Sequence, residues 1–184
     1  NCASLTSISI PNAVTRIGTS AFLNGFSLTN VTIGDSVITI GERAFSSCYS
    51  LTNVTIPNSV ISIGTSAFAD CTRLTDVRIG NNVTSIGTAA FSSCISLTNV
   101  AIPTSTTNIQ SYAFYSCASL TEVTLPDGVT SIGTGVFRYC TALTNAMIGN
   151  GVTSMGDQVF ADCNRLASET IGQNVARIGD SAFS

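Results

Sequence analysis

The sequence repeats every 23 residues, and this period constrains the fold more than any other feature. Its seven cysteines lie at multiples of 23 residues from one another, and Gly25 occupies the one remaining slot. The 184 residues divide into eight such units without an insertion or a deletion. Because a unit this short cannot bury its own apolar side chains, the units must stack on one another and share a continuous core.

The repeated unit reads C-x-x-L-x-x-V-x-I-[PG]-x-x-V-x-x-I-G-x-x-A-F-x-x, as in residues 48–70. Within it, Val54 and Ile56 alternate with Asn53 and Thr55, which predicts a strand with one buried face. Pro or Gly ends this strand, and a second short extended piece is expected over residues 60–63. The A-F-x-x-C corner is too short for more than a turn of helix or 3-10 helix.

The run L-x-x-V-x-I-P-x-x-V-x-x-I-G-x-x-A-F-x-x-C resembles the BspA-like leucine-rich-repeat family, whose members are found on bacterial and protozoan cell surfaces. The resemblance covers all eight units and implies a right-handed leucine-rich-repeat solenoid of the β-rich α/β class. It implies a parallel sheet on the concave face, with short strands and turns or 3-10 helix on the other faces. We expect residues 1–184 to form a single leucine-rich-repeat domain of eight coils, as part of a longer chain.

The composition argues against several classes of function. Charged residues make up 9% of the chain, which has a net charge of -3 and only scattered Arg, so a nucleic-acid partner is not expected. The absence of His removes the commonest general base and metal ligand, and no paired-carboxylate or G-x-S-x-G motif occurs. The apolar runs are far shorter than the roughly 20 residues of a membrane-spanning helix. We expect no enzyme activity, cofactor, metal or membrane insertion in this segment.

The cysteines and a few departures from the repeat give further expectations. Equal spacing, an odd count and the lack of C-x-x-C favour a buried column of reduced thiols over disulfides or zinc. Thr106 and Gln110 replace Val and Gly, which predicts a looser turn in the fifth coil. Ala146 and Glu169 replace the inward Val of the last two coils. Glu169 either protects a terminal edge strand or marks a frayed end.

Outward residues of the main strand should form two rows on the concave face, which is the usual contact surface of a solenoid. The rows are mostly Asn, Thr and Ser, and a hydrogen-bonded ladder that serves only solubility and sheet pairing would explain them. Their monotony is broken by Asp76, Arg78, Glu122 and Met147, where we place a partner. The candidate binding residues on this face are Asn53, Asp76, Arg78, Asn99, Glu122, Asn145 and Met147.

A second candidate patch lies near the A-F-x-x-C corner. Interfaces favour Tyr and Arg at the positions that contribute most to binding. Four such residues lie at this corner in two successive repeats, namely Tyr112, Tyr115, Arg138 and Tyr139. Random placement on a tolerant outer loop is the alternative interpretation.

The leading functional hypothesis is an extracellular or cell-surface module for adhesion or protein binding, with a host or matrix protein as partner. The alternative is a structural subunit that stacks end to end into a filament, because both ends are ordinary repeats that would continue in phase. A chain cut at a repeat boundary would look the same. Asn30, Asn53 and Asn82 begin Asn-Val-Thr sequons, which matter only in a eukaryotic host.

Overall fold

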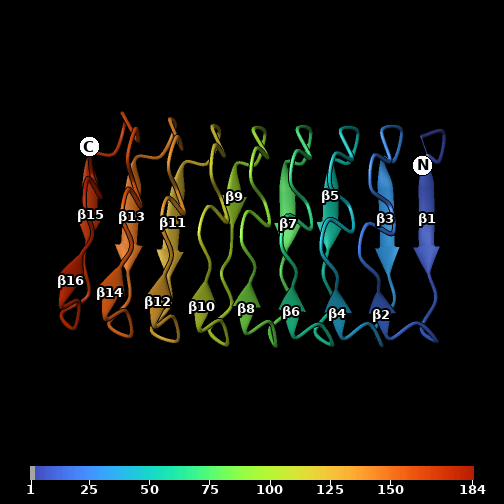
Figure 1. The fold of residues 1–184 in the computed structure, drawn as a ribbon, viewed down its shortest axis with the longest axis horizontal. Helices are drawn as coiled ribbons and strands as arrows, with labels where there is room; N and C mark the ends of the chain where they lie inside the picture. Colours follow the sequence, from blue (N-terminus) through green and yellow to red (C-terminus); the bar gives the residue numbers. More distant parts are fainter. Residues whose placement is uncertain (1–2) are drawn as a thin grey trace.

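The computed structural model describes residues 3–184 and shows a β-solenoid whose coils lie side by side along one axis (Figure 1). The two ends of the chain lie at opposite ends of the stack, and each coil contributes two strands. The first strand of each coil is odd-numbered. These strands are β1 (Ser7–Ile10), β3 (Asn30–Ile33), β5 (Asn53–Thr55), β7 (Asp76–Arg78), β9 (Asn99–Val100), β11 (Glu122–Leu125), β13 (Asn145–Ile148) and β15 (Ser168–Thr170).

The second, even-numbered strand of each coil is the short extended piece that the sequence predicts. These strands are β2 (Arg16–Ile17), β4 (Thr39–Ile40), β6 (Ser62–Ile63), β8 (Ser85–Ile86), β10 (Asn108–Ile109), β12 (Ser131–Ile132), β14 (Ser154–Met155) and β16 (Arg177–Ile178). They form one continuous eight-stranded parallel sheet in chain order. The Gly after most of these strands permits close stacking: a Cβ on Gly64 would lie 2.7 Å from the carbonyl carbon of Gly41.

The odd-numbered strands are also parallel, as predicted, but they do not form one sheet. They divide into three sheets, β1-β3, β5-β7-β9 and β11-β13-β15. Within each sheet, residues that are 23 positions apart lie opposite each other, so that Val54 faces Val77 and Val77 faces Val100. The two interruptions therefore fall between β3 and β5 and between β9 and β11.

The core consists of columns of identical side chains, which confirms the predicted stacking. In the Phe column, Phe91 lies between Phe68 and Phe114, with ring centroids 5.3 and 5.4 Å away and nearly parallel planes. The same contacts continue to Phe22 at one end and Phe183 at the other. All three central rings are fully buried. Like side chains meet from coil to coil because each coil repeats the path of the one before it.

The six cysteines among residues 3–184 are buried and unpaired, as predicted, while Cys2 lies outside the described residues. Each thiol donates a hydrogen bond to the carbonyl of the Phe 26 residues earlier, as from Cys71 Sγ to Phe45 O at 3.3 Å. Burial raises the pKa of the Cys48 thiol to about 11 and that of Cys94 well above its usual value. The column therefore consists of neutral thiols that act as small apolar groups with one weak donor each.

The A-F-x-x-C corner consists of turns, and residues 3–184 contain no α or 3-10 helix. Two residues in most coils adopt the left-handed conformation, such as Ser66 at φ 51° and Asp70 at φ 60°. Alternate backbone N–H groups bond across to the next coil, as from Phe68 N to Ala90 O at 2.8 Å. This alternation prevents a helical hydrogen-bond run. No helix in the described part is long and apolar enough to cross a membrane.

The predicted loose turn in the fifth coil is wrong. Thr106 is fully buried and its hydroxyl donates a hydrogen bond to Val83 O at 2.9 Å. The Gln110 side-chain oxygen accepts a bond from Thr88 N at 3.1 Å, and β10 pairs in register with both neighbours. The side-chain bonds replace the packing lost with Val and Gly. Glu169 is exposed on the terminal strand β15, which remains paired to β13 rather than fraying.

Candidate binding surface

The outward side chains of the odd-numbered strands form a surface that we call the odd-strand face. The Asn residues of this face do not bond to one another in the part of the chain that the structure describes; Asn53 Nδ2 donates instead to Thr52 Oγ1 at 3.2 Å. A hydrogen-bonded ladder does exist one residue earlier, where Thr75 Oγ1 donates to Thr52 O at 3.0 Å. The Thr column therefore supports the coil stacking, and the Asn side chains stay available for other contacts.

A groove of about 440 Å³ opens on this face where β9 and β11 are unpaired. Four of the predicted binding residues line it, namely Asn99, Glu122, Asn145 and Met147. Met147 is 45% exposed, although most coils have Thr or Ser at this position. Six further residues line the groove without having stood out in the sequence, namely Val100, Ala101, Ile102, Thr104, Thr124 and Pro126.

The remaining three predicted residues lie elsewhere on the face. Asn53 lines a second hollow of about 470 Å³, at the interruption between β3 and β5. Asp76 and Arg78 lie on β7, between the two hollows, and form an ion pair with 3.5 Å between Arg78 Nε and Asp76 Oδ2. Both side chains are exposed, so this pair adds little stability and remains accessible.

A second ladder of hydrogen bonds lies in the turn after each odd-numbered strand, and it has no bond at either interruption among the described residues. We call it the Asx row, because most of its members are Asn or Asp: Asn12, Asp35, Asn58, Asn81, Thr104, Asp127, Asn150 and Gln173. Four side-chain oxygens of the row accept a backbone N–H from the next coil, as Asn58 does from Asn81 N at 2.8 Å. All four bonds join coils whose odd-numbered strands are paired, although the paired strands β7 and β9 have no such bond between Asn81 and Thr104 among the described residues.

Neither unpaired junction has an Asx-row bond among the described residues. At the β9/β11 junction the row contains Thr104, whose side chain has no carbonyl oxygen to reach the next coil. The groove thus lies where the ladder residue is changed, and Thr104 was a readable signal in the sequence. At the β3/β5 junction Asp35 retains an acceptor, and the structure gives no side-chain reason for the gap.

The second predicted patch, which we call the outer patch, is brought together by the fold. Tyr115 makes edge contacts with Tyr112 and Tyr139, at centroid distances of 5.8 and 5.4 Å. The Arg138 guanidinium lies 4.7 Å from the centroid of the Tyr139 ring. All four predicted residues, Tyr112, Tyr115, Arg138 and Tyr139, therefore form one cluster.

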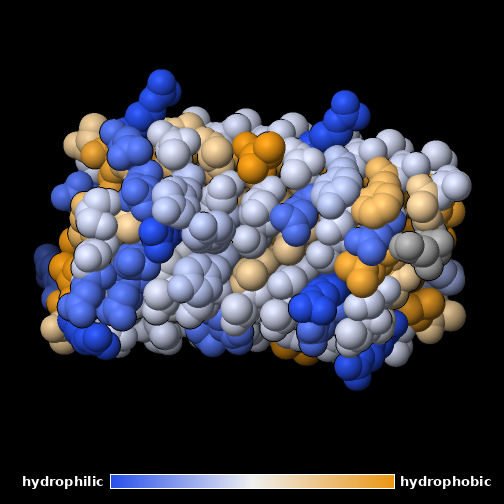
Figure 2. Space-filling model, turned by 45° about the horizontal axis from the view of Figure 1, so that its top comes forward, coloured by the Kyte–Doolittle hydropathy of each residue, from blue (hydrophilic) through white to orange (hydrophobic). Residues whose placement is uncertain are grey.

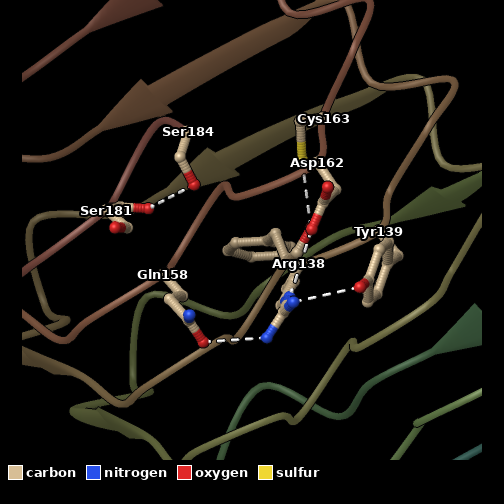
Figure 3. A network of polar contacts seen from close by, with 8 residues as sticks. Arg138, Tyr139, Gln158, Asp162, Cys163, Ser181 and Ser184 are labelled. Carbon is tan, nitrogen blue, oxygen red and sulfur yellow. Dashed lines mark hydrogen bonds and ion pairs between the residues drawn. The ribbon is translucent and has the colours of Figure 1, made fainter.

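Three residues that the sequence did not indicate complete this cluster, and two of them, Gln158 and Asp162, are seen beside Arg138 in Figure 3. Arg138 donates hydrogen bonds to Gln158 at 2.9 Å and to Asp162 at 3.3 Å. Gly135 leaves room for the Tyr112 ring, because a Cβ there would lie 2.6 Å from a ring carbon. The outer patch is consequently held by contacts across three coils rather than being a set of independent loop side chains.

The rest of the surface offers little other chemistry. The face shown in Figure 2 is mostly pale, the colour of intermediate hydropathy, and strongly hydrophobic or hydrophilic residues are scattered over it. Residues 3–184 contain no group of three or more Cys, Asp or Glu side chains placed to hold a metal ion. The grooves and the outer patch are therefore the candidate contact sites.

The repeat geometry agrees with comparisons against known proteins. The family model described as BspA type Leucine rich repeat region matches six copies, over residues 1–117 and 72–184. The chain belongs to the BspA-type leucine-rich-repeat family. This family fold is a repeat scaffold that generally binds proteins and is typically non-catalytic.

Two solved structures illustrate the likeness of this BspA-type chain to bacterial leucine-rich-repeat proteins. The Treponema pallidum (T. pallidum) leucine-rich-repeat protein TpLRR is 30% identical, with a TM-score of 0.74, over 95% of this chain and 78% of that one. A leucine-rich-repeat protein from Bacteroides ovatus is 26% identical, with a TM-score of 0.60, over 100% of this chain and 65% of that one. The search of curated protein sequences found no match.

Proposed function

We propose that this BspA-type chain is an adhesion module that acts outside the cell or at its surface and binds a host or matrix protein through the odd-strand face. The observation that carries the proposal is the groove between β9 and β11. Glu122 and Met147, which depart from the commonest residue at their positions, line this groove together with Asn99 and Asn145.

The contrast between the two strand surfaces supports this assignment. The even-numbered strands form an unbroken sheet closed by tightly packed glycines. The odd-strand face has two hollows and an exposed ion pair between them. Concave sites with a few placed polar groups are the usual form of a binding site. Surface location is supported by the family resemblance, and Asn30, Asn53 and Asn82 are all exposed as sequons would need to be.

The test uses substitutions that replace groove residues with those found at the same place in other coils. A triple variant, Glu122→Asn, Met147→Thr and Ala101→Thr, restores the majority residue and should leave the fold intact. The immobilised chain and this variant are exposed to a panel of purified extracellular-matrix and serum proteins, and retained protein is measured by interferometry. We expect the parent chain to retain at least one protein and the variant to lose most of that binding.

The matched control changes exposed apolar residues away from the odd-strand face. Ile38 and Ile61 stand where other coils have Thr84 and Thr107, so Ile38→Thr with Ile61→Thr is again a change towards the repeat. This control should bind like the parent chain. Retention of no protein by the parent chain, or equal loss in both variants, would refute the assignment.

The outer patch is proposed as a second contact surface of the same module. Tyr112 is 38% exposed and packs against the edge of the Tyr115 ring, which lowers the entropy cost of ordering it on binding. Replacing Tyr112 and Tyr115 with Ser, the residue of several other coils at both places, should weaken retention of a partner that spans both surfaces. Unchanged retention would exclude this patch from the interface.

End-to-end assembly is the second candidate function. The observation that favours it is the apolar surface of the last coil, where Ile178 and Phe183 are 49% and 42% exposed, while Val14 and Phe22 are half-buried in the first. A second copy stacked in phase would cover these side chains. Light scattering of the 184-residue chain at rising concentration decides the matter: growth of the mean mass supports assembly, and a constant monomer mass excludes it.

A further inference from the structure

We propose that the groove between β9 and β11 receives an extended protein segment that carries basic side chains four residues apart with an apolar side chain midway between them. The inference rests on the proposed function and names the chemistry of the partner. It follows from the shape of the groove, from its charges and from the spacing between those charges.

The groove is longer than the hollow that the binding residues define. A third hollow, of about 470 Å³, adjoins this groove on the C-terminal side of β11, and the two share Thr104, Thr124, Pro126 and Met147 as lining residues. Together they form one elongated trough that runs beside β11 and its following turn. Glu122 lines one hollow and Asp127 lines the other, so the trough has a carboxylate towards each end.

The charge of the trough is entirely negative. Glu122 and Asp127 are the only ionisable residues that line it, and within residues 3–184 neither takes part in an ion pair. Asp127 Oδ1 accepts a backbone bond from Asn150 N at 2.7 Å, which fixes the direction of that carboxylate. Charge complementarity therefore favours a partner with a cationic group at each end.

The middle of the trough is apolar. Met147, Ala101 and Pro126 lie between the two carboxylates, and Met147 is the exposed one of its strand. Methionine adapts its shape to different apolar partners. A leucine-sized side chain in the partner would cover Met147, and the aliphatic stems of flanking Arg or Lys residues would cover the rest.

The spacing of the carboxylates selects an extended partner. Glu122 begins β11 and Asp127 lies in the turn after its end, five residues later, so that the backbone positions are less than about 18 Å apart. In an extended strand, residues four apart point to the same side and are separated by about 14 Å. The flexible arms of Arg or Lys bridge the small difference. Residues two apart reach only about 7 Å and would leave one carboxylate without a partner.

The test titrates the ¹⁵N-labelled chain with three peptides and follows amide shifts by NMR. The probe is acetyl-Arg-Ser-Leu-Ser-Arg-amide, with Arg-Arg-Leu-Ser-Ser as the isomer of wrong spacing and Glu-Ser-Leu-Ser-Glu as the charge reversal. We expect the probe to shift amides of β9, β11 and β13, to bind several-fold more tightly than the isomer, and to weaken as salt rises. The charge-reversed peptide should not bind.

Consensus variants locate the contact. Glu122→Asn and Asp127→Asn restore the commonest residues of their rows, and each should weaken the probe about threefold, the size expected for one exposed ion pair. The controls Glu42→Gln and Asp70→Asn make the same change in net charge at exposed sites away from the trough and should leave probe affinity unchanged.

Three results would overturn the inference: equal affinity for both Arg peptides, equal weakening by the control variants, or shifts confined to other coils. These differ from failure of the proposed function. A retained protein partner that is lost in the Glu122, Met147 and Ala101 variant, together with no preference for the probe, rejects the basic extended segment and keeps the adhesion face. Retention of no protein rejects the adhesion face itself.

Discussion

Truncation of Phe91 should destabilise the solenoid far more than the same change at the end of the same column. Phe91 is fully buried between two parallel rings, 5.3 and 5.4 Å away, whereas Phe183 is 42% exposed and has one ring neighbour at 5.4 Å. Removal of a fully buried Phe leaves a cavity and costs about 4 kcal/mol. With roughly half the burial and one neighbour, Phe183→Ala should cost about 1.5 kcal/mol.

Urea unfolding followed by circular dichroism measures both free-energy changes. The chain should unfold with a reduced midpoint in Phe91→Ala and with a nearly unchanged slope, because the surface exposed on unfolding stays the same. Both variants replace Phe with Ala in the same column, so the ratio of the two reductions in the free energy of unfolding reflects the difference in burial between Phe91 and Phe183. A loss below about 1 kcal/mol in Phe91→Ala, or equal losses in both variants, would refute the stacked Phe core.

Two further predictions follow from the coil packing. Burial raises the thiol pKa values, to about 11 for Cys48, so the unfolded state loses its thiol protons first and the free energy of unfolding should fall as pH rises above 9, with little change below it. In melts at pH 7 to 10.5, a variant with Cys48, Cys71, Cys94, Cys117, Cys140 and Cys163 all changed to Ala should lose most of this alkaline sensitivity. An unchanged dependence of stability on pH in that variant would count against the thiol column. Gly87→Ala should lower the free energy of unfolding by at least about 2 kcal/mol, because its Cβ would lie 2.7 Å from the Gly64 backbone. A Cβ on Gly18 meets open space, so Gly18→Ala should be near neutral. Similar melting temperatures for the two variants would contradict the close stacking.

The sequence predicted the coil, the two strands per coil and the buried columns, because a fixed period forces each side chain to meet its own copy in the next coil. Phe91 could be placed between Phe68 and Phe114 from spacing alone. The same logic predicted the thiol column. Cys71 bonds to Phe45 O, and the other five described cysteines make the equivalent bond. Periodic positions are predictable because the environment of each one is made by the others.

The interruptions of the odd-numbered strands were not predicted, because they depend on single departures whose effect is geometric. Thr104 removes a side-chain carbonyl from the Asx row at the β9/β11 junction, where the two strands are no longer paired as one sheet. The departure at Thr106 has no such result, because its hydroxyl finds Val83 O. Spacing alone does not distinguish the two. The candidate binding residues Glu122 and Met147 were predicted because each breaks the regular row of its position. That both line one trough is seen only in the three-dimensional structure.

Residue-resolved amide hydrogen exchange tests most directly whether the odd-strand face is open at two junctions of an otherwise continuous stack. The account predicts slow exchange along the whole even-numbered sheet, from β4 to β14, and distinctly faster exchange in β5 and β11, at the unpaired junctions, than in the paired strands β7 and β13. Uniform protection of all the odd-numbered strands would contradict the account, because a closed sheet leaves no trough for a partner.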